Sequence, residues 1–144
     1  MGEPTVIDEM LRTAKTIAVV GMSDKPWRAS HNIGRYLAAN GYRVIPVNPA
    51  LSQVLGMACY PDLDAAQAAV RAETGEGIDL VDVFRSSEHV PAIVDDVIRR
   101  NIPYLWLQDG VVHDEAVARA HAAGVKCVES DCIYRRHARW VEAH

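Results

Sequence analysis

The strongest constraint on the fold is a regular alternation of short apolar runs with longer amphipathic stretches along the chain. The apolar runs, each of strand length, cover residues 16–20, 42–47, 80–84, 103–107 and 125–128. Apolar residues at helical spacing fill the stretches between them. Strands that alternate with helices need right-handed crossovers, which give a parallel sheet with helices on both faces. We therefore predict that residues 1–144 form one doubly wound, Rossmann-like α/β domain with about five strands.

The helices are predicted between these runs. We expect them over about residues 5–15, 31–40, 61–72, 88–100 and 114–123, and from residue 133 onward. Thr5 is the predicted cap of the first helix, Ser30 of the second, and Ser86 or Ser87 of the fourth. Gly41 is a predicted helix stop. A short extended piece is expected at residues 57–60.

Charge and hydropathy exclude several classes of protein. The chain has 15 Lys and Arg against 19 Asp and Glu, a net charge of −4, and no basic run longer than a pair. Broad nucleic-acid binding is therefore not expected. No apolar stretch approaches the ~20 residues of a membrane span, and charged residues interrupt the first fifteen positions. We expect a cytoplasmic protein without membrane contact, whose three cysteines are reduced thiols.

The loop after the first strand, residues 21–30 (GMSDKPWRAS), has the composition of an anion site. Gly21 allows a sharp backbone turn, and Ser23 supplies a hydroxyl. Lys25 and Arg28 add positive charge just before a helix start, where backbone N–H groups lack partners. Phosphate is the ligand group that such a loop fits. An ordinary strand-to-helix turn with two solvated cations has the same composition, so a second feature is needed.

Known nucleotide and hydrolase motifs do not fit this loop. A dinucleotide fingerprint needs glycines where Ser23 and Pro26 stand, and an acidic residue near Asn48 at the end of the second strand. NAD is therefore the weaker candidate. A Walker loop is not present, and Lys25 replaces the last glycine of a G-x-S-x-G motif.

Four motifs together carry a family resemblance, which covers roughly residues 17–139. They are VGMSDKP at 20–26, GYRVIPVNP at 41–49, DLVDVFR at 79–85 and LWLQDGV at 105–111. With them the chain resembles small stand-alone CoA-binding proteins, which are related to the N-terminal nucleotide-binding domain of the succinyl-CoA synthetase alpha subunit.

The resemblance implies a ligand and a set of contacts. It implies that the first loop holds the phosphates of coenzyme A, and that the other motifs line the same crevice. The implied residues of the first loop are Gly21, Met22, Ser23, Lys25, Arg28 and Ser30. Those of the later loops are Asn48, Pro49, Phe84, Arg85, Gln108, Gly110 and Val111. Asp109 departs from the less acidic residue expected there and would oppose phosphate if it faced inward.

The residues themselves support part of this assignment. An acidic chain must concentrate cations locally to bind CoA, and Lys25, Arg28 and Arg85 are placed to do so. An ion pair with Glu88 would equally explain Arg85, and Phe84 would equally serve as a core aromatic.

Two further residues are candidate contacts on their position alone. His89 starts the helix after Arg85, where it either faces the cleft or is a solvated helix residue. Cys132 falls just before the last helix, where its thiol could reach CoA, unless it is a buried and inert cysteine.

No catalytic or metal site is predicted. The six histidines form no H-E-x-x-H motif, and most are expected at solvated helix positions. Cys127, Cys132 and His137, with Cys59, could offer zinc ligands, but the C-x₂-C spacing is missing. We find no paired carboxylates outside solvated helix or turn positions.

The resulting hypothesis is a non-catalytic protein that binds CoA or acyl-CoA, as a carrier, sensor or regulatory module, with an unidentified protein partner allowed. One alternative is a subunit of an acyl-CoA ligase that another chain completes. The other is an NAD(P)-binding, redox-sensing domain. The ligand retained on purification would separate them.

Overall fold

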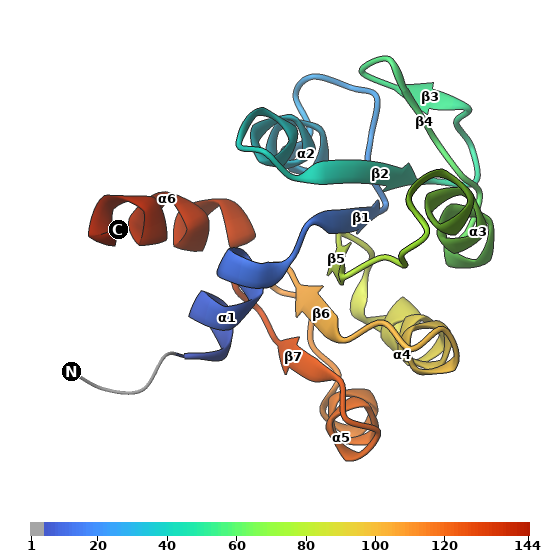
Figure 1. The fold of residues 1–144 in the computed structure, drawn as a ribbon. Coiled ribbons are helices and arrows are strands. Elements are labelled where there is room, and N and C mark those ends of the chain that lie inside the picture. The colour runs from blue at the N-terminus through green and yellow to red at the C-terminus, as the bar shows by residue number, and fades with distance from the viewer. Residues whose placement is uncertain (1–4) are drawn as a thin grey trace.

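The computed structural model describes residues 5–144, which form a five-stranded parallel sheet between two layers of helices (Figure 1). The strand order is β2-β1-β5-β6-β7. The strands are β1 (Thr16–Val20), β2 (Arg43–Val47), β5 (Leu80–Val83), β6 (Tyr104–Leu107) and β7 (Lys126–Val128). The predicted doubly wound α/β fold is therefore confirmed.

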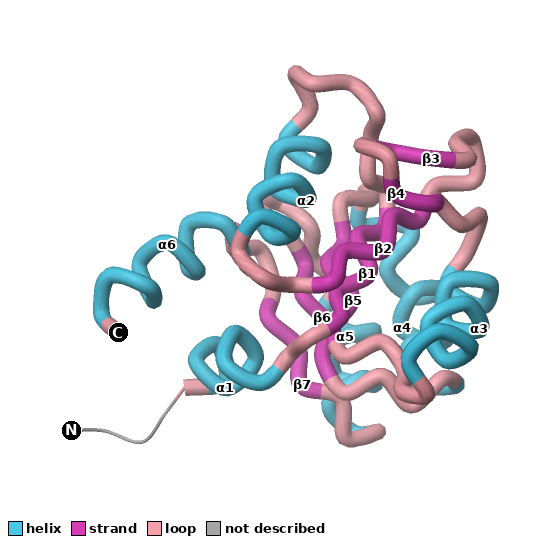
Figure 2. The backbone as a smooth tube through the Cα atoms, turned by 45° about the horizontal axis from the view of Figure 1, so that its top comes forward, coloured by secondary structure: helices cyan, strands magenta, loops and turns pink. Residues whose placement is uncertain are grey.

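The helices cover both faces of the sheet, as Figure 2 shows: α1, α2 and α6 lie on one side, and α3, α4 and α5 on the other. Their bounds are α1 (Val6–Thr13), α2 (Ala29–Ala39), α3 (Leu63–Thr74), α4 (Val90–Arg99), α5 (Asp114–Ala122) and α6 (Ile133–Ala143). A single 3₁₀ turn, Ser87–His89, precedes α4. No helix within residues 5–144 is long and apolar enough to cross a membrane.

The central strand β1 places the ends of three strands in line. Val20 is in register with Val47 of β2 and with Val83 of β5. The chain moves from β1 outward to β2, and then returns to the other side of β1 to form β5. The order of strands thus reverses between β1 and β5, and the loops after these strands lie next to each other. In open α/β sheets this is where ligands bind.

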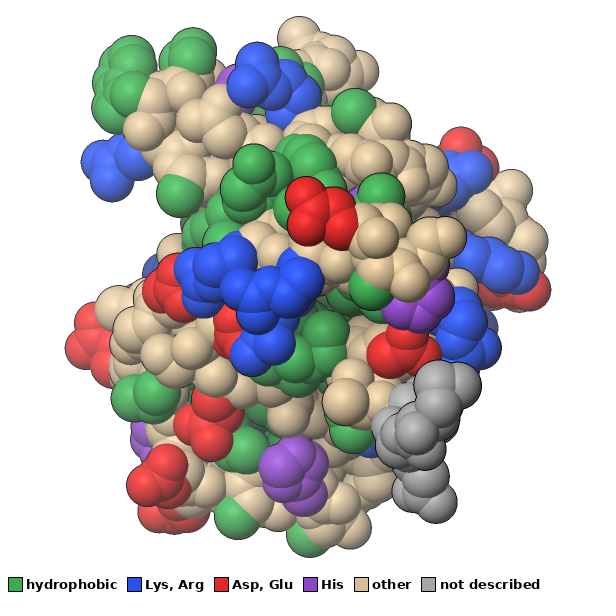
Figure 3. All heavy atoms as spheres, turned by 90° about the vertical axis from the view of Figure 1, so that its left-hand side faces the viewer, with side chains coloured by type: hydrophobic (Ala, Val, Ile, Leu, Met, Phe, Trp, Pro, Cys, Tyr) green, Lys and Arg blue, Asp and Glu red, His purple; other side chains and the backbone are tan. Residues whose placement is uncertain are grey.

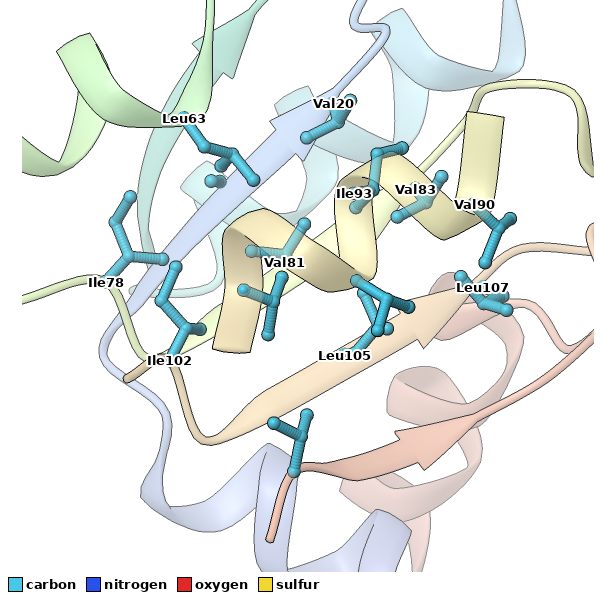
Figure 4. Close-up of a cluster of buried hydrophobic side chains, with 14 of the residues drawn as sticks. Val20, Leu63, Ile78, Val81, Val83, Val90, Ile93, Ile102, Leu105 and Leu107 are labelled. Carbon is cyan, nitrogen blue, oxygen red and sulfur yellow. The ribbon is translucent and has the colours of Figure 1, made fainter. Parts of the chain in front are cut away.

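The core consists of two clusters, one on each face of the sheet. The cluster under α3, α4 and α5 includes Val81, Ile93 and Leu105, whose side chains meet between β5, β6 and α4 in Figure 4. The cluster under α1, α2 and α6 includes Met10 and Leu37. Strands buried on both faces explain why the strand sequences are continuously apolar.

One charged residue interrupts this pattern. Asp82 lies at the centre of β5, between Val19 of β1 and Trp106 of β6. Its side chain is fully buried, and neither carboxyl oxygen has a hydrogen-bond partner. Burial raises the pKa of Asp82 well above its usual range, because the charged form would be desolvated. Burial thus favours the protonated form of Asp82 in the folded protein.

The predicted helix caps are partly right. Thr5 accepts a hydrogen bond from the Asp8 N–H and caps α1. Ser30 does not cap α2, which begins at Ala29, because its hydroxyl instead accepts a bond from the Ser23 N–H.

The predicted caps of the fourth helix are also wrong. Ser86 makes no capping bond. The Ser87 hydroxyl donates to the Gly110 carbonyl and accepts from the Val112 N–H. The Ser87 hydroxyl thus joins two loops that meet only when the chain folds.

A small hairpin follows β2. It pairs β3 (Gln53–Val54) with β4 (Met57–Ala58) in antiparallel register. Leu55 and Gly56 form its turn, both with positive φ, as a two-residue hairpin requires. The sequence predicted a loop to Gly56 and an extended piece after it, so β3 was missed.

The two edge strands have distinct features. β2 contains Pro46, which has no N–H for a sheet ladder and is tolerated because β2 lies at the edge. β7 is three residues long. Its first residue, Lys126, donates to both Glu9 carboxylate oxygens of α1 at 2.8 and 3.0 Å.

Candidate ligand-binding site

A hollow of about 330 Å³ lies at the carboxyl ends of β1 and β5, on the α2 side of the sheet. Five of the residues assigned to the first loop line it, together with Ala29 and one aromatic residue of the loop after β5. The lining residues are Gly21, Ser23, Lys25, Arg28, Ala29, Ser30 and Phe84. The loop after β1 and the residue after β5 thus meet, as the sequence predicts.

The first loop is held in place by its own side chains. The Ser23 N–H donates to the Ser30 hydroxyl at 3.0 Å, and the Lys25 N–H donates to the Ser23 hydroxyl at 3.0 Å. Nδ1 of the buried His31 ring lies 2.9 Å from the Ser23 carbonyl oxygen. The Asn32 amide donates to the Pro26 carbonyl at 2.9 Å. The loop backbone is therefore preorganised.

Gly21 is required by its surroundings. Its φ is +87°, a conformation that other residues rarely adopt. A Cβ at this position would lie 3.1 Å from the Phe84 carbonyl oxygen and 3.1 Å from Cδ of Arg85. The loops after β1 and β5 approach this closely only because Gly21 has no side chain.

Positive charge and free backbone donors meet at this hollow. Lys25 and Arg28 both line it, and α2 begins directly after Arg28 without a side-chain cap. The first N–H groups of a helix and its dipole favour an anion there. A phosphate group fits this combination of two cations, hydroxyl groups and a helix N-terminus.

A second hollow of about 190 Å³ lies on the opposite side of the sheet, between the ends of β1 and β2 and helices α3 and α4. Its walls are mostly apolar, with Arg85, His89 and two carboxylates among the polar groups. The lining residues are Val20, Val47, Pro49, Pro61, Asp62, Leu63, Arg85, His89, Ala92, Ile93 and Asp96. Arg85 therefore lies between the two hollows, since its Cδ approaches Gly21.

Arg85 and His89 contact each other at the rim of the second hollow. Nη2 of Arg85 lies 3.2 Å from Nε2 of His89. The alternative partner, Glu88, lies instead 3.8 Å from His89 and accepts a bond from the Ser86 hydroxyl. Arg85 thus turns toward the cleft rather than toward Glu88.

Asn48 ties the loops after β1 and β2 together. Its amide donates to the Met22 carbonyl at 3.1 Å, and its side-chain oxygen accepts from the Ala50 N–H at 2.9 Å. The Met22 side chain is fully buried against Gly34, so the structure brings it into neither hollow. Only the Met22 backbone belongs to the loop.

The loop after β6 makes internal bonds and lines neither hollow. The Gln108 side-chain oxygen accepts from the Ile133 N–H at the start of α6. The Gly110 N–H donates to the Ser130 hydroxyl, and Val111 is buried. The structure thus places Gln108, Gly110 and Val111 at the same edge of the sheet as the hollows without bringing them into either.

Asp109 does not face the phosphate site. Both of its carboxylate oxygens accept bonds from the Arg135 guanidinium of α6, at 3.1 and 3.2 Å. The Asp131 carboxylate, next to this contact, accepts a hydrogen bond from the Arg136 guanidinium.

Basic and acidic side chains also lie next to each other on the surface formed by α1 and α6 (Figure 3).

The three thiols differ in their surroundings. Cys132 is buried at the residue that precedes α6, and its N–H donates to the Asp131 carboxylate. Burial raises the pKa of the Cys59 thiol, and it raises the pKa of the Cys127 thiol to about 12.

Within residues 5–144, no group of three His, Cys, Asp or Glu side chains lies close enough together to bind a metal ion.

Two of the six histidines are buried and four are not, which agrees with the expectation that most are solvated. His31 and His137 are buried. Nδ1 of His137 lies 2.7 Å from the Tyr36 hydroxyl, and this contact joins α6 to α2.

The sequence analysis did not identify two hydrophobic residues that line the second hollow, Leu63 and Ile93. Both lie in the first turns of helices that begin at the carboxyl ends of the strands.

Residues 15–138 match the family described as CoA binding domain. This chain belongs to that family. It is 36% identical over 132 residues to the uncharacterized protein YneT of Bacillus subtilis (strain 168), covering 92% of each chain. It is also similar to the solved structure of a hypothetical protein from Pyrococcus horikoshii OT3, with a TM-score of 0.83, 34% identity and coverage of 94% of this chain and 89% of that one.

The family also connects the chain to larger enzymes. An ADP-forming acetate–CoA ligase of Archaeoglobus fulgidus is 24% identical over 135 residues. The match takes in 87% of this chain but only 18% of the ligase. The family membership confirms the resemblance that the four sequence motifs indicated.

Proposed function

We propose that this protein binds coenzyme A or an acyl-CoA at the two hollows. The observation that carries the proposal is the preorganised loop of residues 21–30, which presents Lys25 and Arg28 to a hollow at the strand-order reversal. CoA bears a pyrophosphate and a 3′-phosphate, which need such cations. Family membership supports the same ligand.

The proposed division of the ligand follows the character of the walls. The phosphates occupy the hollow beside Lys25 and Arg28. The base lies in the more apolar second hollow, with the Arg85 side chain between the two. Gly21 lets the loop after β5 pack closely against the first loop, which brings Phe84 and Arg85 beside the proposed phosphate site.

The proposed role is non-catalytic: a carrier, sensor or regulatory module in which residues 1–144 act as one binding domain in the cytoplasm. The groups at the hollows serve phosphate and base recognition, and Arg85 and His89 contact each other at the rim. A ligase subunit completed by another chain is the second candidate, favoured by the partial match to the A. fulgidus ligase. Native mass spectrometry of freshly purified protein distinguishes the two, through the retained ligand and any partner chain.

A thermal scan with CoA and with NAD tests the ligand. At one hundred times its dissociation constant, a ligand stabilises the fold by about 2.7 kcal/mol, which raises the Tm of a chain of this size by roughly 5–10 °C. We expect this shift with CoA and a smaller one with NAD at the same concentration. An equal or larger shift with NAD would contradict the proposal.

Lys25→Ala is the matched control for this scan. Lys25 stands exposed in a polar loop, so its loss should change the Tm of the free protein little. CoA binding should weaken about tenfold or more, and should also become less sensitive to salt. Unchanged CoA binding by this variant at low salt would show that the loop is not the phosphate site.

A further inference from the structure

The most exposed large hydrophobic side chain of the protein's described part is Trp27, at the tip of the first loop. Its exposed fraction is 73%, although tryptophan is among the most buried residue types on average. Packing in the hydrophobic core therefore does not explain why a tryptophan stands at this position. It stands between Lys25 and Arg28, the two cations of the first hollow.

The backbone around Trp27 is fixed at several points. The Arg28 N–H donates to the Lys25 carbonyl at 3.0 Å, which closes a turn over residues 25–28. The Asn32 amide holds the Pro26 carbonyl, and the Ser23 hydroxyl accepts from the Lys25 N–H. The remaining freedom at this turn lies in the side chains.

One side-chain contact restricts that freedom. Nζ of Lys25 lies over the Trp27 ring, 5.6 Å from its centroid, within the range of a cation–π interaction. A lysine stem has four rotatable bonds, and its ammonium loses much freedom when it binds an anion. The indole has two side-chain torsions and limits this freedom before the ligand arrives.

We propose that Trp27 is a positioning residue of the phosphate site, which holds the Lys25 ammonium where it meets a phosphate of the ligand. The inference rests on the proposed function, and it concerns phosphate-bearing nucleotides such as CoA. Trp27 acts through Lys25 and makes no required contact with the ligand itself.

A double-mutant cycle tests this role by isothermal titration of the full chain with CoA. Trp27→Ala should weaken binding roughly two- to fivefold, the size of an exposed cation–π interaction. In a Lys25→Ala background the same substitution should change the affinity little, because the group that Trp27 positions is gone. Trp27→Phe, which keeps an aromatic face, should recover part of the loss.

Two controls separate positioning from general effects. Val112→Ala removes another exposed hydrophobic side chain, in the loop after β6, and should leave CoA affinity unchanged. The Tm of the free Trp27→Ala protein should stay near that of the unmodified chain, since the indole packs little.

The outcomes separate this inference from the proposed function. An equal loss in both backgrounds would mean that the indole touches the ligand directly, and no loss in either would mean that it does nothing for binding. Both results overturn the positioning role while CoA binding stands. Failure of the unmodified chain to bind CoA, or unchanged binding by Lys25→Ala, overturns the proposed function and this inference with it.

Discussion

Asp82 is an ionisable residue in an apolar environment. Its carboxyl group is fully buried between β1 and β6, without a hydrogen-bond partner. The folded state keeps the proton, whereas the unfolded chain releases it above about pH 4. The folded state thus binds one more proton, so the free energy of unfolding falls as pH rises, up to the raised pKa of Asp82.

Asp82→Asn should remove this pH dependence. The stability of the variant relative to the unmodified protein should increase by up to about 1.4 kcal/mol for each pH unit above pH 4, until the folded pKa is reached. Urea denaturation at pH 5 and pH 7.5 measures it, with the exposed Glu115→Gln as control. A stability difference that does not change with pH would show that the carboxyl group is ionised in the fold.

Cys132 is the thiol for which we predict a reaction with CoA disulfide, although its side chain is buried and lines neither hollow. It lies at the start of α6, while raised pKa values keep Cys59 and Cys127 protonated. The Cys132 thiolate would attack one sulfur of CoA disulfide, forming a protein–CoA disulfide and releasing one CoA thiolate. Intact mass should show one adduct that a reductant removes and that Cys132→Ser lacks. An adduct on that variant, or none on the unmodified chain, would leave Cys132 as a packing residue.

Single residues were harder to predict from sequence than strands. Ser30 looks like a helix cap, but its hydroxyl serves a loop donor seven positions earlier. His137 looks solvated, yet it lies four positions after the buried Ile133 on the same face of α6. That spacing was the available signal. Met22 sits in a loop by sequence, but its side chain fills the space beside Gly34.

At the scale of elements, α6 is joined to the domain by a polar contact within an aromatic cluster. The His137 ring packs edge-on against Tyr36 and Tyr42, and Trp140 of α6 donates to Asp8 of α1. Burial lowers the pKa of His137. Nδ1 of the ring lies 2.7 Å from the Tyr36 hydroxyl, and burial disfavours the charged ring, so protonation of His137 weakens the docking of α6.

Acid should therefore destabilise the protein through His137. Because its folded pKa lies below the unfolded value of about 6.5, the stabilising contribution is complete above pH 6.5 and is lost as pH falls. His137→Phe should cost stability at pH 7.5 but should show a smaller further loss on acidification to pH 5.5. Urea denaturation of both proteins at the two pH values checks this. Equal acid losses would assign the effect to other groups.

The strands were predictable because burial on both faces leaves a continuous apolar run, and β1 matches its predicted bounds. The hairpin strand β3 could not be predicted, since two residues are too few to show the alternation of apolar and polar side chains that distinguishes a strand from a loop. The predicted start of α2 was late, because Ser30 lies inside the helix and its hydroxyl accepts from the Ser23 N–H. The predicted start of α4 was early, because Ser87 belongs to a 3₁₀ turn and its hydroxyl accepts from the Val112 N–H.

For the whole molecule, the two ends of the parallel strands have different roles: ligand contacts are proposed at the carboxyl ends, and the amino ends carry structural turns. The hollows lie at the carboxyl ends of β1, β2 and β5, and the turns at residues 75–79 and 100–103 lie at the opposite ends of the strands. CoA should slow amide hydrogen exchange in residues 21–30 and 84–89 and leave those two turns unchanged. Uniform protection throughout the chain would instead indicate global stabilisation without a local site.

The location of the site at this edge could be predicted from sequence, because strand–helix alternation fixes where parallel strands end. The split into two hollows could not. It depends on where packing places Leu63 of α3, Ile93 of α4 and the Arg85 side chain around the strand ends, which the sequence pattern does not specify.

The edge strands described above have a consequence for self-association. An exposed sheet edge invites a strand from another chain, and proteins block this with proline, charge or short strands. Pro46 removes a donor from β2, and the short β7 begins with Lys126, held by Glu9. Strand addition is thus opposed at both ends of the sheet. We therefore expect a protein that binds this domain to use its helices or loops, and copies of the chain at high concentration to have little tendency to extend one another's sheet.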